Sequence, residues 1–510
     1  MLIIYNLLEL RTALNNIKLK EKQVGLVPTM GALHQGHISL IKRAISECDA
    51  VVVSIFVNPL QFAPHEDLAQ YPRNVEADCQ LCEKLGVKIV FAPSVEEIGV
   101  TGDTETQTNT TTVIPPESMT SGLCGKYRPG HFIGVATIVT KLLNIVQPDR
   151  AYFGQKDAQQ LAIIRRLVID FNLPVNIVGC QIVREESGLA LSSRNQYLTP
   201  EEKTQATILH RSLQQAAIAF RKGIKETASL IKTVKNQLAT IPEVKMQYVE
   251  LVDPATLQPL TIVEKTGLLA IAAHLGKTRL IDNIILRQPI VAIDGPAGAG
   301  KSTVTRRVAK ELGLLYLDTG AMYRAVTWLV MNSQIVVDDE SAVAKIVKGV
   351  KIDLIPGNTP HLPVEVYINQ QEVTQAIRTP EVTANVSAIS AQAAVRKELV
   401  QAQQNYGVEG GIIAEGRDIG TNVFPDAELK IFLTASPQER AKRRLSDLQN
   451  QGYKDINLKQ LEQEIIERDN KDSNRAIAPL KKADDAIEII TDRLSIEEVI
   501  NKIKELYSNL

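Results

Sequence analysis

One short segment limits the possible folds of the second half of this chain more than any other. In IVAIDGPAGAGKST an apolar stretch runs into Gly295, Gly300, Lys301 and Ser302, and helix-forming residues follow. This is the G-x-x-x-x-G-K-[ST] pattern in the strand–loop–helix order that phosphate binding needs, because the glycines let backbone N–H groups turn toward phosphate oxygens. The pattern predicts a parallel α/β sheet with a triphosphate held at the start of its first helix.

Each residue type in this glycine-rich loop has an expected role. Lys301 is expected to reach the β and γ phosphates of ATP, and Ser302 is the expected ligand of a magnesium ion. The residues expected to bind ATP here are Gly295, Gly298, Gly300, Lys301, Ser302 and Thr303.

The totals of the sequence limit the class of protein. A chain of 510 residues is too long for a single core and predicts several domains. With 57 Lys and Arg against 58 Asp and Glu, the chain has no overall positive field, which argues against nucleic acid or an anionic membrane as a partner. No apolar run is long enough for a transmembrane helix. The odd number of cysteines indicates a reducing, cytoplasmic setting and not a disulfide framework.

Two of the cysteines stand in a C-x-x-C pattern. Cys79 and Cys82 lie within NVEADCQLCEKLGV, whose apolar residues recur with helical periodicity. No second C-x-x-C and no His pair follows, so ordinary helix residues are favoured over a zinc site.

The first part of the chain alternates apolar and amphipathic segments. A short strand and a helix at the N-terminus precede expected strands at residues 24–29, 50–58 and 87–93, with helices between them, and a further helix and strand end near residue 183. This alternation predicts a parallel sheet covered on both faces, here a Rossmann-like domain over residues 1–183. The Thr-rich residues 100–118 are expected to form a loop or an irregular hairpin.

The composition then changes. A helical stretch at about residues 200–238 precedes several short strands, which predicts a small α+β domain over residues 184–286. Only the residues RQP separate the last of these strands from the strand before the glycine-rich loop, whereas a flexible tether would be longer and richer in Gly or Ser. We therefore predict that the two halves, residues 1–286 and 289–510, are held close to each other.

Three polar segments accompany the glycine-rich loop. LDTGAMYR follows an expected strand, AEGRDIG lies at the carboxyl end of another, where ligands of such sheets bind, and ERDNKDSNRAIAP is expected as a polar segment after a helix. Phosphoryl transfer depends on positioning and charge neutralisation, so arginines are expected around the phosphates. For the last segment, a solvated helix face is the alternative. The residues singled out are Asp318, Thr319, Arg324, Arg417, Asp418, Arg468, Lys471, Asp472 and Arg475.

Together these segments resemble bacterial cytidylate kinase, a P-loop NTPase-type nucleoside monophosphate kinase, over residues 289–510. GPAGAGKST, DTGAMYR, NVSAISAQAAVR, EGRDIG and ERDNKDSNRAIAP have that family's order and spacing. The resemblance implies a nucleotide-binding insertion, a lid, and phosphorylation of CMP or dCMP by ATP, with Lys301 and Arg475 catalytic. The residues that it implies for CMP are Thr319, Arg324, Ser387, Arg396, Arg417, Asp418, Arg468, Asp472 and Arg475.

Considered apart from the family resemblance, the residues of the second half leave several interpretations open. Ser387 and Arg396 would then be interpreted as parts of a surface helix, and the preference for cytosine comes from the family alone. The second half could be a kinase for uridylate or adenylate, or an ATP-sensing module without transfer activity. Acceptor-side residues such as Arg417 and Asp418 argue against the module, because a sensor does not need them.

In the first half, VPTMGALHQGHISLIKRA places His34 and His37 where a strand ends and a helix begins. Imidazoles at a helix N-terminus can donate to phosphate oxygens and stabilise the charge that builds up during attack on an α-phosphate. Metal binding is less favoured, since no third ligand is evident nearby and Gly36 indicates close approach of the backbone.

Four further segments supply polar residues. They are IFVNPLQF, RPGHF, FGQKDAQQL and ALSSRN. Uncharged amides suit a small hydroxy acid, whereas Lys156 and the Ser-Ser-Arg loop suit a triphosphate. As alternatives, Gln61 is a turn residue and Lys156 a solvated one. The residues singled out are Asn58, Gln61, Arg128, His131, Lys156, Asp157, Gln160, Ser192, Ser193 and Arg194.

This combination resembles pantothenate synthetase, or pantoate–β-alanine ligase, over residues 1–282. That family has a Rossmann-type nucleotidyltransferase fold, and YVELVDP and LGKTRLIDN in the small domain also look like it. The resemblance implies catalysis by His34, His37, Lys156 and Arg194 and binding of pantoate by Gln61 and Gln160. The residues that it implies for ATP are Met30, His34, His37, Gly154, Lys156, Asp157, Ser192, Ser193 and Arg194.

One residue departs from the pattern of the family. Its usual G-E-K-D is Gly154-Gln155-Lys156-Asp157 here, so the lost carboxylate is expected to alter the orientation of Lys156. Asp157 is expected to accept hydrogen bonds from the nucleotide or from a magnesium-bound water. The family also implies that this half associates with a second copy of itself.

The two resemblances imply two fused enzymes that both use ATP. The first would join pantoate to β-alanine through pantoyl adenylate, with the small domain closing over the site because acyl adenylates hydrolyse in water. The second would phosphorylate CMP. Their substrates share only ATP, so no channelling between them is expected.

Overall fold

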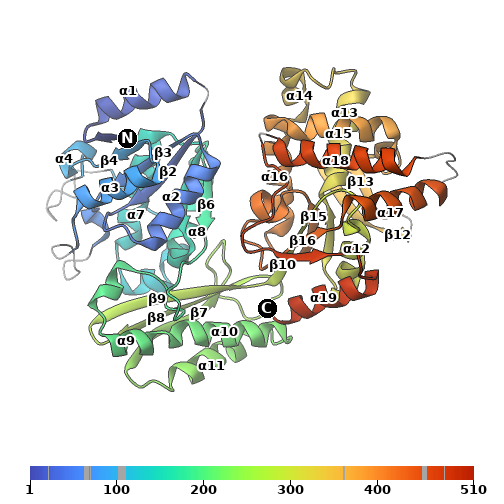
Figure 1. Cartoon of the computed structure of the whole chain (residues 1–510). Coiled ribbons are helices and arrows are strands. Elements are labelled where there is room, and N and C mark those ends of the chain that lie inside the picture. The colour runs from blue at the N-terminus through green and yellow to red at the C-terminus, as the bar shows by residue number, and fades with distance from the viewer. Residues whose placement is uncertain are drawn as a thin grey trace. The chain divides into compact units, whose positions relative to one another are not determined.

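A computed structural model describes residues 1–20, 22–62, 68, 71–100, 111–359, 362–450, 457–475 and 477–510. The chain divides into two compact units, Met1–Leu286 and Arg287–Leu510 (Figure 1). Strand β9 (Thr278–Leu286) closes the first unit and strand β10 (Gln288–Asp294) opens the second, so Arg287 alone lies between them. The join is shorter than the expected three residues. The close association of the two halves stays a prediction.

The first unit contains a parallel sheet, as the sequence predicts. The strand order is β1-β4-β3-β2-β5-β6, and every neighbouring pair is parallel. β3 is buried along its whole length, which explains why its sequence is apolar except for Ser54 and does not alternate. The strands are β1 (Leu2–Ile4), β2 (Val24–Thr29), β3 (Ala50–Ile55), β4 (Ile89–Phe91), β5 (Arg150–Gly154) and β6 (Asn176–Cys180).

Helices cover both faces of this sheet. Helices α1 (Leu7–Lys18), α7 (His131–Val146) and α8 (Ala158–Asp170) pack against one face, where their apolar residues share a core with β2 and β4. Helices α2 (Gln35–Glu47) and α3 (Val75–Leu85) pack against the other face. The short helices are α4 (Val95–Ile98), α5 (Glu117–Thr120) and α6 (Leu123–Tyr127).

The structure of this unit can be compared with two expectations, one for the C-x-x-C segment and one for the Thr-rich residues 100–118. Cys79 and Cys82 are helix residues, as expected, and are buried in the core beneath α3. None of the five cysteines, all within the described residues, forms a disulfide. Of the expected loop at residues 100–118, residues 101–110 lie outside the described part of the chain, and α5 begins at Glu117.

The small domain packs a three-stranded sheet between two layers. Strands β7 (Val244–Val252), β8 (Gly267–Leu275) and β9 are antiparallel. One face carries α9 (Pro200–Ala206), α10 (Ile208–Arg221) and α11 (Thr227–Leu238), and the other contacts α6, α7 and α8. The expected helical stretch is therefore three helices, and Gly223 adopts φ +97° where the chain turns from α10 to α11. The boundary between residues 183 and 184 stays a prediction, since both parts belong to one unit.

The second unit is built on a five-stranded parallel sheet with the order β11-β15-β10-β16-β17. β10 is therefore central, although it comes first in this half, and the glycine-rich loop leaves its carboxyl end. The other strands are β11 (Leu315–Asp318), β15 (Gly410–Gly416), β16 (Leu429–Thr434) and β17 (Ile487–Ile490).

Helices cover this second sheet on both faces as well. Helices α12 (Lys301–Leu312) and α19 (Ile496–Ser508) share a core on one face, and α13 (Thr319–Asn332), α15 (Pro380–Ala391) and α16 (Ala393–Gly407) share the core on the other. Between α13 and α15 the chain forms α14 (Glu340–Val347) and a small antiparallel sheet of β12 (Ile352–Thr359), β13 (Leu362–Ile368) and β14 (Gln371–Glu372).

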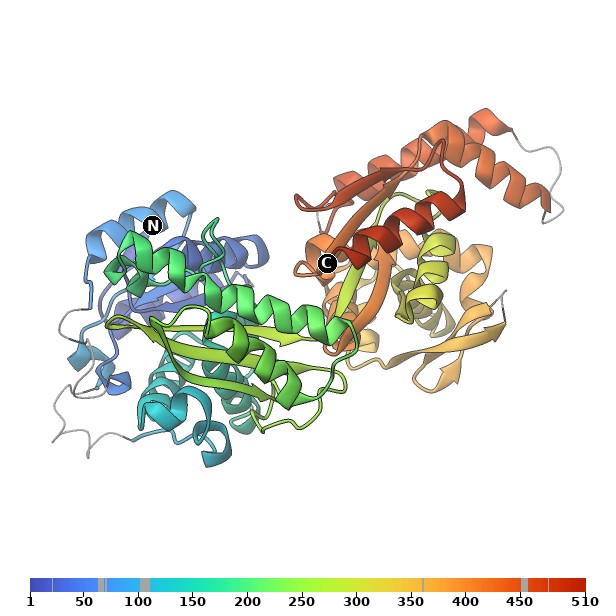
Figure 2. The ribbon, with the colours of Figure 1, turned by 90° about the horizontal axis from the view of Figure 1, so that it is seen from below.

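Helices α17 (Pro437–Asn450) and α18 (Leu458–Asn474) lie side by side and project beyond the second sheet, as Figure 2 shows. The expectation that ERDNKDSNRAIAP follows a helix is wrong for its first part. Arg468, Lys471 and Asp472 lie within the last turns of α18, and only Arg475 comes after the helix. The charged side chains of this segment suit an exposed helix end, so the helix continues where the sequence suggests a break. Within the described residues, no helix has the length and apolar character needed to cross a membrane.

Candidate active sites

A cavity of about 320 Å³ in the first unit lies between the carboxyl ends of the parallel strands and the sheet of the small domain. Its walls bring together all the residues that sequence analysis singled out in this half, although they come from five separate segments. These residues are Met30, His34, His37, Asn58, Gln61, Arg128, His131, Gly154, Lys156, Asp157, Gln160, Ser192, Ser193 and Arg194.

The two histidines are fixed at the start of α2 by the backbone of their own turn. His34 is the N-cap residue, and its Nδ1 accepts a hydrogen bond from the Gly36 N–H at 3.1 Å. His37 Nδ1 accepts one from the His34 N–H at 3.3 Å. A Cβ atom at Gly36 would lie 2.8 Å from the His34 ring, so the close approach inferred for this glycine is present.

The protonation state of these rings follows from burial and charge. Burial as the main cause, with the neighbouring His34 and Lys156 as lesser causes, lowers the pKa of His37 to about 3. Burial and the charge of Lys156 also lower the pKa of His34. Both rings are therefore neutral near pH 7. Because each Nδ1 is an acceptor, the hydrogen lies on Nε2, which makes each Nε2–H a donor for an anion.

Asp78 holds the loop before His34, and sequence analysis missed it. Its carboxylate is buried and accepts hydrogen bonds from the N–H groups of Ala32 and Leu33, both at 2.9 Å. Gly31 adopts φ +83° to turn the chain over this carboxylate. Asp78 stands directly before Cys79, so an acidic residue on the buried side of α3 was the available signal.

A second set of contacts fixes Gln61. The buried Asn58 side chain donates to Gln61 Oε1 at 3.3 Å and to the Gly134 carbonyl oxygen at 3.1 Å. Gln61 Nε2 donates to Met30 Sδ at 2.7 Å. A Cβ atom at Gly134 would lie 2.2 Å from the Leu60 carbonyl oxygen, so glycine is required for α7 to approach this turn. The amide of Gln61 is thus held in one orientation at the cavity wall.

His131 and Arg128 support the same turn from its other side. His131 Nδ1 lies 2.8 Å from the Gln61 carbonyl oxygen, and Arg128 lies 3.0 Å from His131 Nε2. Both side chains line the cavity. The guanidinium of Arg128 therefore brings a positive charge to the end of the cavity that holds Gln61.

The turn that carries Lys156 is held by the small domain. Asn283 on β9 donates from Nδ2 to the carbonyl oxygens of Gln155 and Lys156 at 3.0 and 2.9 Å. Asn283 is buried, and its neighbour Asp282 forms a bidentate ion pair with Arg184 at 2.7 and 3.0 Å. Gln155 contributes its backbone to this contact. The expected effect of its side chain on Lys156 stays a prediction.

Ser192 organises the third wall of the cavity. Its Oγ accepts a hydrogen bond from the Arg194 N–H at 3.3 Å, and this bond begins the 3-10 helix Ser193–Tyr197. The turn places Ser192, Ser193 and Arg194 together at the cavity wall. Hydroxyl groups and a guanidinium provide donors for phosphate oxygens there.

In the second unit the glycine-rich loop curls around its own lysine. The buried Lys301 ammonium donates to the carbonyl oxygens of Gly295 and Pro296, both at 2.7 Å. Gly295 has φ +148°, and a Cβ atom there would lie 2.0 Å from the Leu433 carbonyl oxygen. Glycine is therefore required for the loop to pass over β16.

Two carboxylates lie behind this loop. Asp294 accepts hydrogen bonds from the N–H groups of Ile419 and Gly420, both at 2.7 Å, and burial raises its pKa to about 6. Glu415 Oε1 accepts a hydrogen bond from the Tyr316 hydroxyl at 2.6 Å. The other oxygen of Glu415 is buried and has no hydrogen-bond partner in the part of the chain that the structure describes. Glu415 stands directly before the Gly-Arg-Asp triplet but was not among the residues expected at this site.

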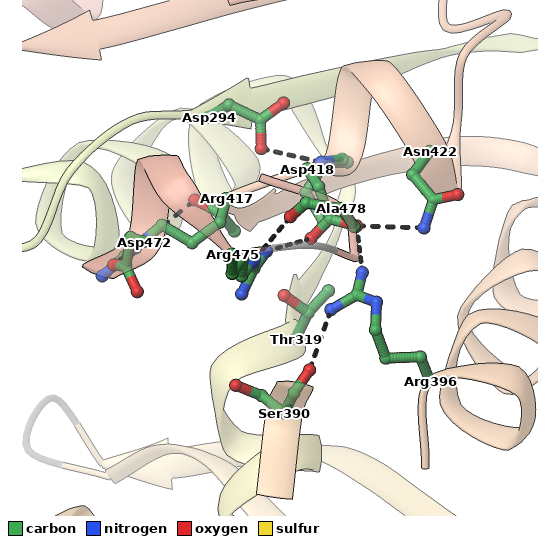
Figure 3. Close-up of polar contacts among 12 residues, drawn as sticks. Asp294, Thr319, Ser390, Arg396, Arg417, Asp418, Asn422, Asp472, Arg475 and Ala478 are labelled. Atoms are coloured by element: carbon green, nitrogen blue, oxygen red, sulfur yellow. Dashed lines mark hydrogen bonds and ion pairs between the residues drawn. The ribbon is translucent and has the colours of Figure 1, made fainter. Parts of the chain in front are cut away.

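Arginines and aspartates meet beside the loop (Figure 3). Asp418 pairs with Arg396 and, at 3.5 Å, with Arg475. Arg417 Nε donates to Asp472 on α18 at 3.0 Å. Thr319 faces the same group from the start of α13, where its hydroxyl donates to the Glu415 carbonyl oxygen at 2.6 Å. The structure thus gathers four of the segments that sequence analysis assigned to one site.

Three further residues expected at this site differ in their burial and in their contacts with this arginine–aspartate cluster. Arg396 is buried, so its interpretation as a surface-helix residue is wrong, and α16 places it against the Tyr323 ring. Ser387 is exposed, and it is the carbonyl oxygen of Ser390 that accepts from Arg396, at 3.3 Å. Arg324 pairs with Asp318 at 3.2 Å beside Thr319. The assignment of Ser387 to the site stays a prediction.

Comparison with known proteins identifies both halves. The model of the pantoate-beta-alanine ligase family matches residues 2–285, and that of the cytidylate kinase family matches residues 291–509. The bifunctional pantoate ligase/cytidylate kinase of Trichormus variabilis is 61% identical over 486 residues, covering 95% of this chain and 91% of its own. The chain belongs to the bifunctional pantoate ligase/cytidylate kinase family.

Other members of this family and one solved structure agree with the assignment. The bifunctional pantoate ligase/cytidylate kinase of Synechocystis is 59% identical over 491 residues, with 95% of each chain covered. A crystal structure of pantothenate synthetase from Thermus thermophilus matches the ligase half with a TM-score of 0.52 and 43% identity, covering 56% of this chain and 100% of its own. Both resemblances inferred from sequence are confirmed, and the chain combines a pantoate–β-alanine ligase with a cytidylate kinase.

Proposed function

We propose that the cavity of the ligase half forms pantoyl adenylate and then pantothenate. A carboxylate oxygen of pantoate attacks the α-phosphorus of ATP, and pyrophosphate leaves with the electrons of the broken P–O bond. The amine of β-alanine then attacks the acyl carbon, AMP leaves, and the amine loses a proton. The observation that carries this proposal is the pair of neutral imidazoles at the start of α2, beside Lys156 in the same cavity.

The residues of this cavity divide into two roles in the proposal. The Nε2–H donors of His34 and His37, together with Lys156 and Arg194, stabilise the charge that develops on the phosphates during attack. The fixed amide of Gln61 and the amide of Gln160 bind pantoate through its hydroxyl and carboxylate groups. The other ATP contacts come from Met30, Gly154, Asp157, Ser192 and Ser193.

In the kinase half we propose that the glycine-rich loop holds ATP and that the arginine cluster holds CMP. Arg396, Arg417 and Arg475 are paired with Asp418 or Asp472 in the structure. Guanidinium groups gathered in this way can transfer part of their hydrogen bonding to the phosphate of CMP and to the moving phosphoryl group. The CMP oxygen attacks the γ-phosphorus, and ADP leaves. Thr319, Arg324, Ser387, Asp418, Arg468 and Asp472 complete the proposed CMP site, in which Asp418 and Asp472 can also accept from the sugar or base.

Magnesium fits the residues present in the kinase half. Ser302 is the second residue of α12, beside the glycine-rich loop, and its side chain interacts with the buried carboxyl group of Glu415. Hydroxyl and carboxylate oxygens are the ligands that magnesium prefers. We propose that these two residues hold the ion, directly or through water. When bound, magnesium supplies neutralisation of the phosphate charge during transfer.

Three further properties are proposed, which are the location of the protein, the acceptors of its kinase and its self-association. We propose that it acts in the cytoplasm, that its kinase accepts dCMP as well as CMP, and that the ligase half associates with a second copy of itself. Cross-linking and light scattering of the full chain and of the separate ligase half test the last point, since a monomer in both cases contradicts it.

A direct experiment tests the proposed chemistry. The full chain is incubated with ATP and magnesium, with pantoate and β-alanine in one reaction and CMP in another. AMP with pyrophosphate in the first reaction and ADP with CDP in the second are expected, and pantoate alone should give pyrophosphate and bound adenylate. Refusal of CMP together with acceptance of UMP or AMP favours a different kinase, and refusal of all monophosphates favours an ATP-sensing module.

A further inference from the structure

We infer that Arg440 is a positioning residue that links the glycine-rich loop to helix α18, so that binding of ATP and binding of CMP are coupled. The inference rests on the proposed assignment of the loop to ATP. Arg440 is not among the residues proposed above to bind ATP or CMP, and none of the motifs inferred from sequence contains it.

Arg440 contacts three segments of the kinase half at once. It lies in the first turn of α17 and is only 3% exposed. Its Nε donates to the Ala435 carbonyl oxygen at 3.0 Å, just after β16, and one terminal nitrogen donates to the Ala297 carbonyl oxygen in the glycine-rich loop at 3.1 Å. The same guanidinium forms a two-point ion pair with Asp469 on α18, one bond of which measures 3.0 Å.

The stem of Arg440 also packs on the loop. A Cβ atom at Gly298 would lie 3.4 Å from Arg440 Cβ, which is ordinary van der Waals contact, so the arginine stem lies directly against the loop at this glycine. The loop is thus supported by the arginine through packing and through a backbone hydrogen bond. If the loop shifts when it binds phosphate, the guanidinium of Arg440 has to move with it.

Asp469 connects Arg440 to the other proposed substrate. In α18 it stands directly after Arg468 and less than one turn before Asp472, and Asp472 accepts a hydrogen bond from Arg417 at 3.0 Å. One short helical segment is therefore held by an arginine from the ATP side and by an arginine from the CMP side. Because a planar guanidinium bonds a carboxylate at two points, it transmits the orientation of α18 better than a single contact does.

A neighbouring arginine on the same helix makes hydrogen bonds to a different segment. Arg443, on α17 as well, donates to the hydroxyl and carbonyl oxygens of Thr491 at 3.0 and 2.9 Å. These contacts tie α17 to the end of β17. Gln438 of α17 also donates to Glu462 of α18, at 2.5 Å, but among the described hydrogen bonds of α17 only Arg440 joins the glycine-rich loop and α18 through one side chain.

Calorimetry on the full chain tests the linkage. The affinity for CMP is measured with and without a non-hydrolysable ATP analogue and magnesium. We expect the analogue to tighten CMP binding by about tenfold in the wild-type chain, a usual size for coupling between two sites. In Arg440→Gln and in Asp469→Asn each ligand alone should bind nearly as in wild type, and the tightening should vanish. The double variant should lose no more than either single variant, because both changes break one connection.

Lys442→Gln is the matched control, since Lys442 is an exposed cation on the same helix and its loss should leave the tightening intact. Tightening that persists in both variants overturns the linkage, as does a wild-type chain that binds both ligands independently. If the Arg440→Gln variant binds each ligand more weakly when that ligand is measured by itself, Arg440 has only a structural role. If Arg440→Gln fails to fold, Asp469→Asn carries the test, because it keeps the arginine and its backbone bonds. Absence of any nucleotide binding to wild type contradicts the proposed ATP site instead.

Discussion

Asn283 of the small domain donates to the backbone carbonyl oxygen of Lys156 at 2.9 Å, and so joins the two layers that enclose the ligase cavity. The same amide nitrogen bonds the Gln155 carbonyl oxygen. The lysine turn is therefore positioned by a residue that follows it in the chain by more than a hundred positions. We therefore expect catalysis by the parallel-sheet domain to depend on this contact with the small domain.

Asn283→Ala should weaken the ligase. Two buried carbonyl oxygens lose their donor, which costs about 1–3 kcal/mol and lets the Lys156 turn move. We expect pyrophosphate release to fall by at least about tenfold, which corresponds to about 1.4 kcal/mol, with the kinase rate of the same chain unchanged. Asn283→Asp keeps the shape but cannot donate, so it should behave like the alanine variant. Full ligase activity in both variants would show that the turn holds its position without this bond.

The two activities should be separable by single substitutions. His37→Ala removes one donor to the developing charge, and losses of about 10²–10³ in rate are usual for such donors. Lys301→Ala should abolish phosphorylation of CMP and spare the ligase. Each reaction is followed in each variant, with AMP and CDP as the products measured. Loss of both activities from one substitution, in a chain that keeps its thermal unfolding transition, contradicts independent sites.

His37 should make the ligase half less stable in mild acid. Its folded pKa of about 3 lies below the ordinary value of 6.5, so the ring is neutral in both states above pH 6.5. As the pH falls from there toward 3, the unfolded ring binds a proton that the folded ring excludes, and the free energy of unfolding falls. His37→Asn does not titrate and should lose less stability in that range. Urea unfolding at about pH 7 and about pH 5, in wild type and variant, measures the difference, and identical losses would contradict a depressed pKa.

Glu415→Gln tests the proposed magnesium site. The amide keeps an acceptor for the Tyr316 hydroxyl but removes the negative charge that faces Ser302. The concentration of magnesium that gives half the maximal kinase rate should rise by about tenfold or more, while the ligase dependence on magnesium stays the same. Glu409→Gln changes an acidic residue elsewhere in the kinase half and is the control. An unchanged magnesium requirement in Glu415→Gln would exclude this carboxylate as a ligand.

Much of the architecture follows from local patterns in the sequence. The alternating apolar and amphipathic segments predict both parallel sheets, because strand and helix periods are properties of neighbouring residues. The motifs place His34, Lys156 and Lys301 at strand ends, and parallel strands bring their carboxyl ends to one edge of a sheet. For this reason, residues from distant segments can be assigned to shared sites on the strength of the sequence alone.

The partners that fix these residues could not be inferred in the same way. Asp78, Asn283, Glu415 and Arg440 were not singled out from the sequence, although Asn283 and Glu415 stand within the quoted segments LGKTRLIDN and EGRDIG. Their contacts join segments that are far apart in the chain. Arg396 looks like a surface residue by its sequence, yet packing of α16 buries it against Asp418. Local spacing specifies which face of a helix is apolar, but which polar group meets a buried charge depends on how the helices and sheets pack. Only the tertiary structure decides that pairing, because burial makes an unpaired charge costly and so selects the arrangement in which it is paired.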